Sequence, residues 1–195
     1  MSTDKTVDTN TTALHLPLPD PLPEDVQTLF DKCMAKLGLI PNVLVTYAHR
    51  PEKLRAFSVM YNDLMLGPSG LSKLEREMIA VAVSSRNSCW YCQVAHGAQV
   101  RALSGDPALG EAMVMNWRVA DLTERQREML KFSIRVTENS ADISQSDRDA
   151  LTHQGFSDED IFDIAAVAAF FNMSNRHASA IGMMPNAEYH AMARG

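Results

Sequence analysis

Residues 72–96 have the sequence SKLEREMIAVAVSSRNSCWYCQVAH, and this segment decides the fold because it contains two helix starts and no strand pattern. Ser72 and Glu75 form a capping box, in which the serine side chain accepts a hydrogen bond from a backbone N–H and the glutamate reaches back to the helix start. The helix that they begin is expected to end near Arg86. A second N-cap follows directly, so a helix over 89–103 is expected as well.

Helical spacing of apolar residues extends over most of the chain on both sides of this segment. Glycines, prolines and capping residues separate the apolar stretches, as is typical of helix ends. The expected helices cover residues 24–37, 42–49, 51–66, 72–86, 89–103, 123–137, 144–154 and 157–182, with a turn at 105–107 and a tail after the last helix. No stretch shows the period-2 alternation of a strand, so the sequence predicts an all-α fold.

The start of the chain differs in composition from the rest. It is polar and then proline-rich, with prolines at alternate positions from Pro17 to Pro23. Proline fixes φ and supplies no backbone donor, so residues 1–23 are predicted to form an extended arm. Residues 24–195 are predicted to form one helical domain.

Two segments of the chain resemble each other. Leu71–Ile79 and Leu122–Leu130 both place a hydroxyl N-cap before a charged and then apolar helix start. The similarity has two explanations, which the sequence leaves open. The domain contains two related helical halves, or both segments are ordinary capped amphipathic helices.

The composition excludes several classes of function. The chain has 195 residues, of which 46% are hydrophobic, and a formal net charge of -6. A nucleic-acid-binding protein would normally show a basic surface, so no nucleic-acid partner is expected. No apolar segment typical of a secretory signal is present near the start, and the longest apolar run, Ile164–Phe171, is far shorter than the roughly 20 residues that cross a bilayer. We therefore expect a cytoplasmic protein without a membrane partner, in which thiols stay reduced unless they cycle.

Two of the three cysteines form a C-x-x-C motif at Cys89 and Cys92. On a helix, Cys89, Cys92 and His96 share one face, and Cys92 and His96 are neighbours one turn apart. Unpaired backbone N–H groups and the helix dipole favour an anion in the first turn, which favours a low pKa for Cys89. The thiolate is the nucleophile, and a nearby histidine can take its proton or stabilise it.

This spacing suits a two-cysteine peroxide cycle. One thiolate attacks the O–O bond and becomes a sulfenic acid, the other cysteine condenses with it to form a disulfide, and a reductant reopens the disulfide by exchange. Glu77 falls on a helical stripe with Leu74 and Val81, where a carboxylate would be buried and would need a partner. It is therefore the candidate for the end of a Glu–His–Cys proton relay.

The C-x-x-C motif has other interpretations. A structural zinc site needs four ligands, but the chain has no second C-x-x-C, and Cys33 could complete a set only by folding back. Cys33 itself lies among apolar residues and is expected in the core. A thioredoxin-type motif should lie next to a βαβ pattern, which the sequence lacks. No nucleotide or flavin fingerprint such as G-x-G-x-x-G is present, so no cofactor and no metal is expected, and reducing power is expected from a partner protein.

The spacing of four residues resembles the core motif of a known family. Glu77, followed twelve residues later by Cys89 and then by Cys92 and His96, resembles the motif of the alkylhydroperoxidase D-like proteins of the carboxymuconolactone decarboxylase superfamily. The wider context looks like the subgroup called peroxidase-related enzymes, and the resemblance covers roughly residues 24–190. The segments that carry this context are Leu37–Asn42, Leu66–Ser72 and Phe171–Arg176.

The resemblance implies an all-helical fold, a homo-oligomer and a role for each site residue. Cys92 would attack the peroxide, Cys89 would resolve the sulfenic acid, and His96 and Glu77 would relay protons. One position departs from the pattern, because well-studied members can carry a histidine directly before the second cysteine, where this chain has Tyr91. Tyrosine is a poor base near neutral pH, which puts the rate of peroxide turnover in doubt.

The sequence thus predicts a peroxidase that reduces organic hydroperoxides, with a thioredoxin-like protein or a lipoyl dithiol as electron donor. A first rival keeps the fold and changes the chemistry to general thiol–disulfide exchange or to a decarboxylase-type reaction. A second rival is a non-catalytic module that binds zinc or senses redox state. A sensor would oxidise once, whereas an enzyme would turn over with a reductant.

Overall fold

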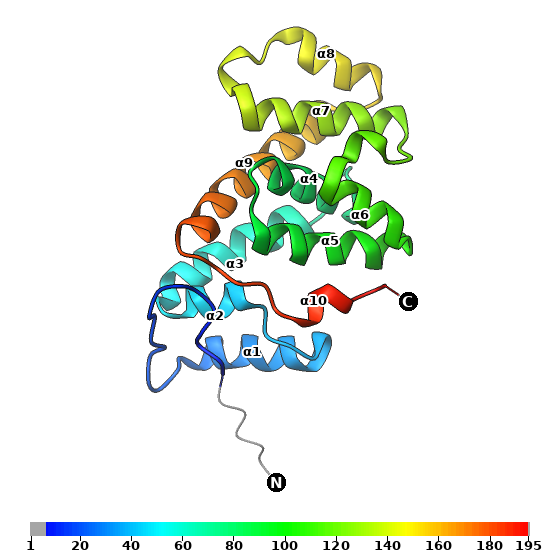
Figure 1. Ribbon diagram of the computed structural model, residues 1–195. Coiled ribbons are helices and arrows are strands. Elements are labelled where there is room, and N and C mark those ends of the chain that lie inside the picture. The colour runs from blue at the N-terminus through cyan, green and yellow to red at the C-terminus, as the bar shows by residue number, and fades with distance from the viewer. Residues whose placement is uncertain (1–6, 195) are drawn as a thin grey trace.

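Helix α4 (Lys73–Arg86) lies at the centre of the computed structural model, which describes residues 7–194 (Figure 1). The capping box predicted at its start is present, because the Glu75 N–H donates to Ser72 Oγ at 3.1 Å and the Ser72 N–H donates to Glu75 Oε2 at 2.8 Å. Every residue from Arg76 to Ser84 is buried. A helix that is covered on all sides forms the core of a helical domain.

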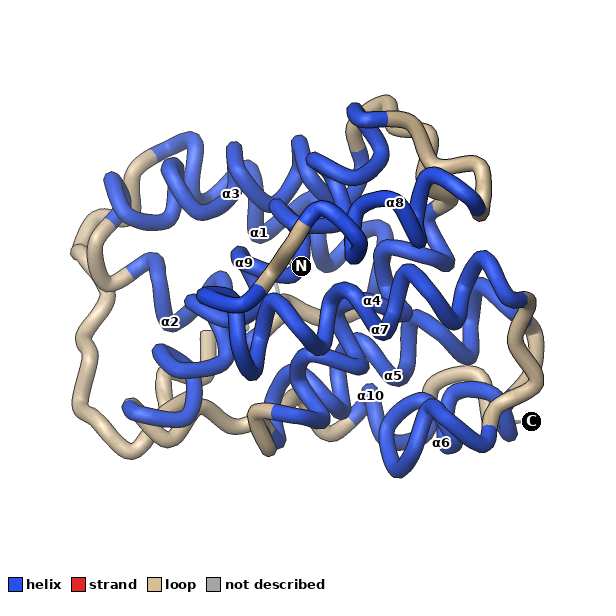
Figure 2. Tube along the Cα trace, turned by 90° about the horizontal axis from the view of Figure 1, so that it is seen from above, coloured by secondary structure: helices blue, strands red, loops and turns tan. Residues whose placement is uncertain are grey.

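Residues 7–194 form nine further α-helices and two short 3₁₀ segments. They are α1 (Glu24–Leu37), α2 (Asn42–Ala48), α3 (Pro51–Leu66), α5 (Trp90–Ser104), α6 (Pro107–Asn116), η1 (Trp117–Val119), α7 (Glu124–Asn139), η2 (Ser140–Asp142), α8 (Gln145–His153), α9 (Asp158–Ala180) and α10 (Glu188–Ala191). Residues 7–194 contain no strand, so the predicted all-α fold is confirmed. From above, loops lie mostly at the edges of the helical body (Figure 2).

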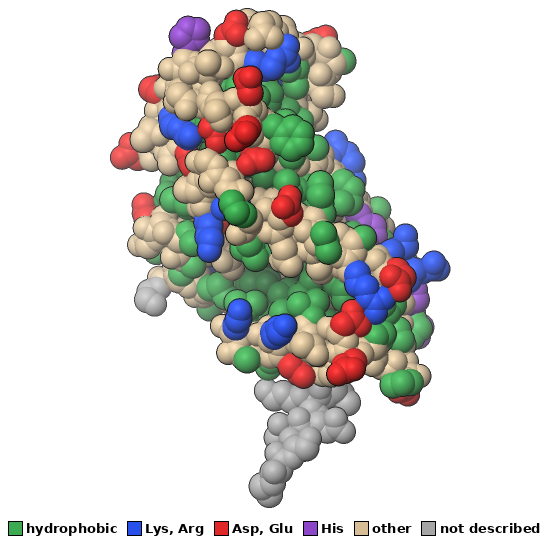
Figure 3. All heavy atoms as spheres, turned by 180° about the vertical axis from the view of Figure 1, so that it is seen from behind, with side chains coloured by type: hydrophobic (Ala, Val, Ile, Leu, Met, Phe, Trp, Pro, Cys, Tyr) green, Lys and Arg blue, Asp and Glu red, His purple; other side chains and the backbone are tan. Residues whose placement is uncertain are grey.

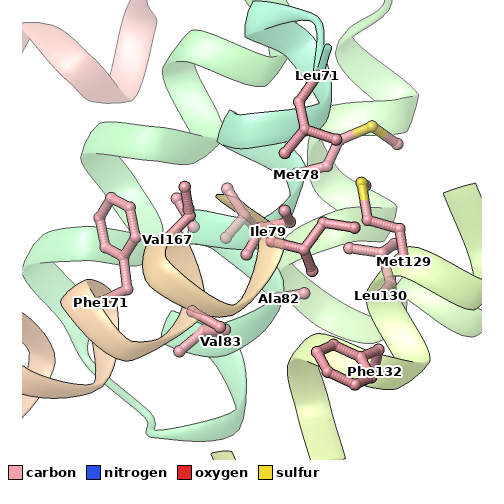
Figure 4. Close-up of a cluster of buried hydrophobic side chains, with 14 of the residues drawn as sticks. Leu71, Met78, Ile79, Ala82, Val83, Met129, Leu130, Phe132, Val167 and Phe171 are labelled. Carbon is pink, nitrogen blue, oxygen red and sulfur yellow. The ribbon is translucent and has the colours of Figure 1, made fainter. Parts of the chain in front are cut away.

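The main hydrophobic core lies where α4, α7 and α9 meet. Figure 4 shows its central side chains pointing toward one another from these three helices. Those that it labels on α4, α7 and α9 are Met78, Ile79, Ala82, Val83, Met129, Leu130, Phe132, Val167 and Phe171. Helix α4 also packs along α5, so the same core that buries α4 fixes the position of the C-x-x-C helix.

Two helices were not predicted from the sequence. Asp106 and Pro107 were interpreted as a turn, but the Asp106 side chain accepts from the Ala108 N–H at 2.8 Å and Pro107 occupies the first turn of α6. The same two residues are a strong helix start, so the error lay in the interpretation of the proline. Helix α10 has four residues and lies in the stretch that was predicted to be a tail.

The N-terminal segment lies on the helical body. Residues 7–23 contain no helix, and residues 1–6 of the predicted arm lie outside the described part. The Ala13 N–H donates to the Ile181 carbonyl at 3.0 Å, and the Met184 N–H donates to the Thr11 carbonyl at 2.9 Å. The Thr11 hydroxyl is also 2.8 Å from that of Thr46. The segment is therefore bonded both to α2 and to the chain after α9.

The two similar sequence segments begin two helices that pack together. Helix α7 starts with a capping box formed by Thr123 and Gln126, as α4 does. Arg125 of α7 donates to Glu75 of α4 at 2.8 Å, so the two helix starts are linked by an ion pair.

The surface carries apolar side chains on several elements. On the face opposite to that of Figure 1, hydrophobic side chains surround a hollow in the lower half of the molecule (Figure 3). The most exposed large hydrophobic side chains are Met115, Val119, Phe162, Val59 and Leu66. Among the helices of the described residues, none combines the length and the hydropathy that a membrane crossing needs.

Candidate active site

The C-x-x-C motif begins α5, directly after the turn that follows α4. Ser88 has a positive φ of 54°, which turns the chain sharply, and the Cys89 N–H donates to the Ser84 carbonyl at 3.0 Å. Cys89 is the N-cap residue of α5, whereas the sequence predicted the N-cap directly before it and Cys89 in the first turn; Cys92 lies in that first turn. Both cysteines are free thiols, and each is only 1% exposed.

His96 and Glu77 form a buried hydrogen-bonded pair next to the cysteines. His96 lies one turn beyond Cys92 on α5, and its Nδ1 is 2.7 Å from Glu77 Oε2 on α4. The two residues are 8% and 7% exposed, respectively. Burial strengthens such a pair because little water competes for either partner. The carboxylate holds the imidazole so that Nδ1 carries the proton and Nε2 is left for chemistry.

The environment of Cys89 favours its thiolate. The hydrogen bond from the Cys92 thiol, together with the Cys92 backbone N–H, the Ser179 side chain and the positive charge of His96, lowers the pKa of Cys89 to about 6 against the opposing effect of burial. The helix-start position predicted this direction. At neutral pH the reduced pair therefore carries one negative charge, held mainly on Cys89.

Cys92 has the opposite tendency. It donates its proton to Cys89, and this hydrogen bond, burial and the nearby charge of Cys89 raise the pKa of Cys92 well above its usual value. Two side chains of α9 oppose this shift, because Asn175 and Ser174 hydrogen-bond the Cys92 sulfur. The two thiols share a single proton, and the balance between them is set by their different partners.

Local sequence does not predict the contribution of α9. Ser174, Asn175 and Ser179 lie more than 80 residues after the motif, and they reach the cysteines because α9 packs along α5. Asn175 is 0% exposed. Ser174 and Asn175 belong to the segment Phe171–Arg176, in which the sequence shows only a family resemblance. The spacing of the three polar residues along one helix is the signal that could have suggested a polar stripe.

Aromatic side chains surround the pair. The Tyr91 hydroxyl accepts a hydrogen bond from the Val43 N–H at 3.2 Å, so it is bonded to α2 and stands apart from the His96–Glu77 pair. Burial raises its pKa well above the usual value. The ring of Phe171 packs edge-on against His96 with centroids 4.6 Å apart. These contacts fix the imidazole from a second side.

The segment after α9 covers the cysteines. Met183 and Tyr189 pack in one apolar cluster with Cys89 and Cys92. The buried Arg101 holds this segment in place, because its guanidinium donates to the Tyr189 carbonyl at 2.7 Å and to the Met192 carbonyl at 2.9 Å. A surface cavity of about 290 Å³ lies on the outer side of α5, and Trp90, Val94 and Tyr189 line part of it.

Other candidate residues lie elsewhere. Cys33 was expected in the core but is only partly buried on α1, outside the apolar clusters of the described residues. His177 of α9 hydrogen-bonds Tyr47 of α2, with 3.1 Å between Nδ1 and the hydroxyl. Within residues 7–194, no group of three or more His, Cys, Asp or Glu side chains is arranged to hold a metal ion.

Comparisons with known proteins identify relatives over the whole chain. Residues 51–108, which include the four site residues, match the model of the carboxymuconolactone decarboxylase family. The chain is 61% identical to an uncharacterized peroxidase-related protein from Silicibacter sp. TM1040, with a TM-score of 0.93 over 97% of this chain and 100% of that one. No protein with a curated description matches.

Two further structures extend the comparison. An uncharacterized peroxidase-related protein from Ralstonia eutropha JMP134, described as an alkylhydroperoxidase AhpD core, is 43% identical, with a TM-score of 0.91 over 95% of this chain and 97% of that one. The debrominase Bmp8 is 21% identical, with a TM-score of 0.76 over 96% of this chain and 98% of that one. At that identity the last match shows the fold alone.

Proposed function

The chain belongs to the carboxymuconolactone decarboxylase family, in its alkylhydroperoxidase D-like group, and on that premise we propose that it reduces hydroperoxides with the cysteine pair of α5. One observation carries the proposal: two buried free thiols one turn apart at the start of α5 lie beside a histidine that a buried carboxylate orients. This arrangement supplies a nucleophile, a resolving thiol and a proton carrier.

The cycle starts from the reduced pair. The proton of the Cys92 thiol passes along its hydrogen bond to Cys89, which leaves the negative charge on Cys92. The Cys92 sulfur then attacks one oxygen of the peroxide, and the O–O bond breaks. The sulfur is oxidised to a sulfenic acid, and the leaving alkoxide takes a proton from the His96 imidazolium to become an alcohol.

The second step closes the disulfide. The Cys89 sulfur attacks the sulfenic sulfur of Cys92, the S–S bond forms, and the hydroxyl leaves as water. The proton of Cys89 passes through His96, which the first step left neutral, to the leaving hydroxide and completes the water, while Glu77 stabilises the charge of His96 in transit. In sum, two thiols and one hydroperoxide become one disulfide, one alcohol and one water.

The cycle then needs an external dithiol. A reduced partner protein reopens the Cys89–Cys92 disulfide by thiol–disulfide exchange, which passes two electrons to the pair. We propose a thioredoxin-like protein or a lipoyl dithiol for this role, because both carry two neighbouring thiols. We also propose that the protein is a homo-oligomer whose interface covers some of the exposed apolar side chains, and light scattering tests the assembly.

A thiol count tests the peroxide cycle. The protein is reduced, freed of metal, and mixed with one equivalent of an organic hydroperoxide. Free thiols should fall from three to one within seconds, and Cys92→Ser should abolish the loss. In Cys89→Ser, a sulfenic acid should form on Cys92 and be trapped by dimedone. A slow loss that is the same in Cys92→Ser would rule out the proposed cycle.

General thiol–disulfide exchange is the second candidate function. The low pKa of Cys89 favours it, because a thiolate at neutral pH attacks disulfides as well as peroxides. Reduction of a small aromatic disulfide, compared with reduction of hydroperoxide under the same conditions, separates the two. Peroxide reduction that is faster by tenfold or more supports the first function, and the reverse order supports the second.

A further inference from the structure

Helix α9 places a polar stripe along the cysteine pair. Ser179 hydrogen-bonds Cys89, and Ser174 and Asn175 hydrogen-bond Cys92. Ala178 packs between these positions in the same apolar cluster as both cysteines. The stripe is therefore a built part of the wall around the sulfurs, and Asn175 is its most deeply buried member.

The side-chain amide of Asn172 has only one possible orientation. Its Nδ2 is 2.9 Å from the Ala168 carbonyl oxygen, which can only accept a hydrogen bond. Its Oδ1 accepts from the Arg176 guanidinium at 2.6 Å, which can only donate. Oxygen and nitrogen of this amide therefore cannot be exchanged.

Asn172 in turn fixes the orientation of Asn87, in the turn before α5, and Asn87 fixes that of Asn175. Asn87 lies 3.0 Å from Asn172 Oδ1 and must donate to it through Nδ2. The same Nδ2 is 3.0 Å from the carboxamide oxygen of Asn175, to which it donates its other hydrogen. Asn175 is thereby held with its oxygen toward Asn87 and its NH₂ group toward the interior.

The NH₂ group of Asn175 has two hydrogen-bond partners to consider, Ser84 and Cys92. Asn175 Nδ2 carries two hydrogens, and one of them is donated to Ser84 Oγ at 2.9 Å. The other is available to Cys92, whose pKa the Asn175 side chain lowers. A buried amide whose donor end is fixed against a sulfur stabilises negative charge there without having to reorient.

We propose that Asn175 stabilises negative charge on the Cys92 sulfur and that Asn172 and Asn87 are positioning residues that keep the donor end of its amide turned toward that sulfur. The effect on the thiol does not depend on peroxide turnover. Its part in turnover rests on the proposed function, in which the charge must move from Cys89 to Cys92 before the peroxide is attacked.

Other ionisable groups also face Cys92. Cys89, the strongest of them, is removed from every variant below. The rest are common to all variants: His96 of α5 with Glu77 of α4, Tyr91 of α5, Tyr47 of α2 and Tyr61 of α3. The tyrosines stay neutral, because the pKa values of Tyr47, Tyr61 and Tyr91 are raised by burial. A change in one α9 amide can thus be measured against a constant background.

The test uses the full chain with Cys33→Ser and Cys89→Ser, which leaves Cys92 as the only thiol. The ultraviolet absorbance of the thiolate is followed against pH. Asn175→Asp keeps the size of the side chain but turns a carboxylate oxygen toward the sulfur. We expect the pKa of Cys92 to rise by about one unit or more, which is a tenfold fall in thiolate at a given pH.

Ser84→Ala is the matched control for a lost buried hydrogen bond. It removes the acceptor of Asn175 but leaves the donor to Cys92 in place. The pKa of Cys92 should therefore change by no more than about a third of the change caused by Asn175→Asp. An unchanged pKa in Asn175→Asp, or an equal rise in Ser84→Ala, overturns the proposal.

Asn87→Asp tests the positioning role away from the sulfur and also serves if Asn175→Asp does not fold. A carboxylate cannot donate to Asn175, so the amide should turn and present its oxygen to Cys92, and the pKa should rise. Ser88→Asp adds the same charge at an exposed neighbouring position, where solvent screens it. Equal shifts in these two variants would overturn the positioning role, and a clearly larger shift in Asn87→Asp supports it.

The peroxide assay separates this proposal from the proposed function. If hydroperoxide leaves the wild-type thiols intact, the proposed function fails while the titrations still decide the role of Asn175. If wild type turns over and Asn175→Asp titrates like wild type, the role of Asn175 fails alone. If both the proposed function and the role of Asn175 hold, hydroperoxide should oxidise the thiols of Asn175→Asp about tenfold more slowly than those of wild type at neutral pH. Raising the pH should recover part of the rate.

Discussion

A single buried contact links the two central helices at the site. Glu77 on α4 and His96 on α5 meet at 2.7 Å, and neither side chain is open to solvent. Removing one partner of such a pair leaves the other without a counter-charge in a place where water cannot replace it. The pair therefore contributes both to the position of the imidazole and to the stability of the helix contact.

Glu77→Gln should slow peroxide oxidation of the thiols by about tenfold or more, because the amide can hold the imidazole but cannot balance its positive charge. Stopped-flow measurement of disulfide formation checks this. Glu75→Gln is the control on the same helix, since Gln also completes a capping box and only the ion pair to Arg125 is lost. Equal rates in wild type and Glu77→Gln would contradict the relay.

The pH dependence of stability follows from the low pKa of Cys89. A thiol with a folded-state pKa of about 6 and an unfolded value near 8.5 makes the folded state bind fewer protons between these values. Its contribution to stability is full above pH of about 8.5 and is lost as the pH falls through 6. The free energy of unfolding of the reduced protein should therefore rise from pH 6 to 8 by more in wild type than in Cys89→Ser.

Urea denaturation under reducing conditions at several pH values measures this difference. An identical pH dependence in wild type and Cys89→Ser would show that the charge of the reduced pair does not reside on Cys89.

At the residue scale, local spacing predicted only part of the site. Cys89, Cys92 and His96 lie within eight positions, and helical geometry alone brings them together. Glu77 was found because an acidic residue in an apolar helix needs a partner. Asn175 could not be found in this way, since its approach to Cys92 depends on how α9 packs against α5.

At the scale of elements, the capping boxes fix where the central helices begin. The N-cap of α4 satisfies a backbone donor at the point where the chain enters the core. It lies more than a turn of helix before Glu77, so it acts on the helix start and not on the site. A cap of this kind contributes about 1 kcal/mol.

Ser72→Ala should lower the free energy of unfolding by about 1 kcal/mol. Ser72→Thr should lower it by much less, because the threonine hydroxyl also accepts a hydrogen bond from the backbone N–H. Chemical denaturation checks both values. The titration of Cys89 should be the same in all three proteins. A shifted thiol pKa in Ser72→Ala would show that the start of α4 is coupled to the site.

How well a helix could be predicted depended on its length and on the capping signals in its sequence. Long helices such as α4, α7 and α9 show both caps and apolar spacing, and their predicted bounds agree with the structure to within a few residues. Helix α6 was missed because an Asp-Pro pair fits a turn as well as a helix start. Helix α10 has four residues and is held by tertiary contacts such as those of Arg101, which local sequence does not show.

At the scale of the whole molecule, the thiols are enclosed. The segment after α9 lies over them, and Arg101 bonds two of its carbonyl groups. Entry of a peroxide or a reductant therefore requires this segment to move. The rate of thiol modification should report how firmly the segment is held.

Arg101→Met keeps much of the side-chain volume but removes both hydrogen bonds. We expect alkylation of Cys89 and Cys92 by iodoacetamide to become at least several-fold faster, because the covering segment opens more often. Glu111→Gln is the control, since it removes only the exposed ion pair to Arg194 near the end of the chain. Unchanged alkylation rates in Arg101→Met would show that reagents reach the thiols by another route.

The joining of the two chain ends has a consequence for this enclosure. Thr11 and Ala13 bond the backbone on either side of Met183, the residue that packs with the cysteines. Residues 11–13, which include no site residue, are therefore expected to open together with the C-terminal segment. Loss of their hydrogen bonds is expected to expose a reactive centre that is encoded some eighty residues later, so a change near one terminus would alter access to the middle of the chain.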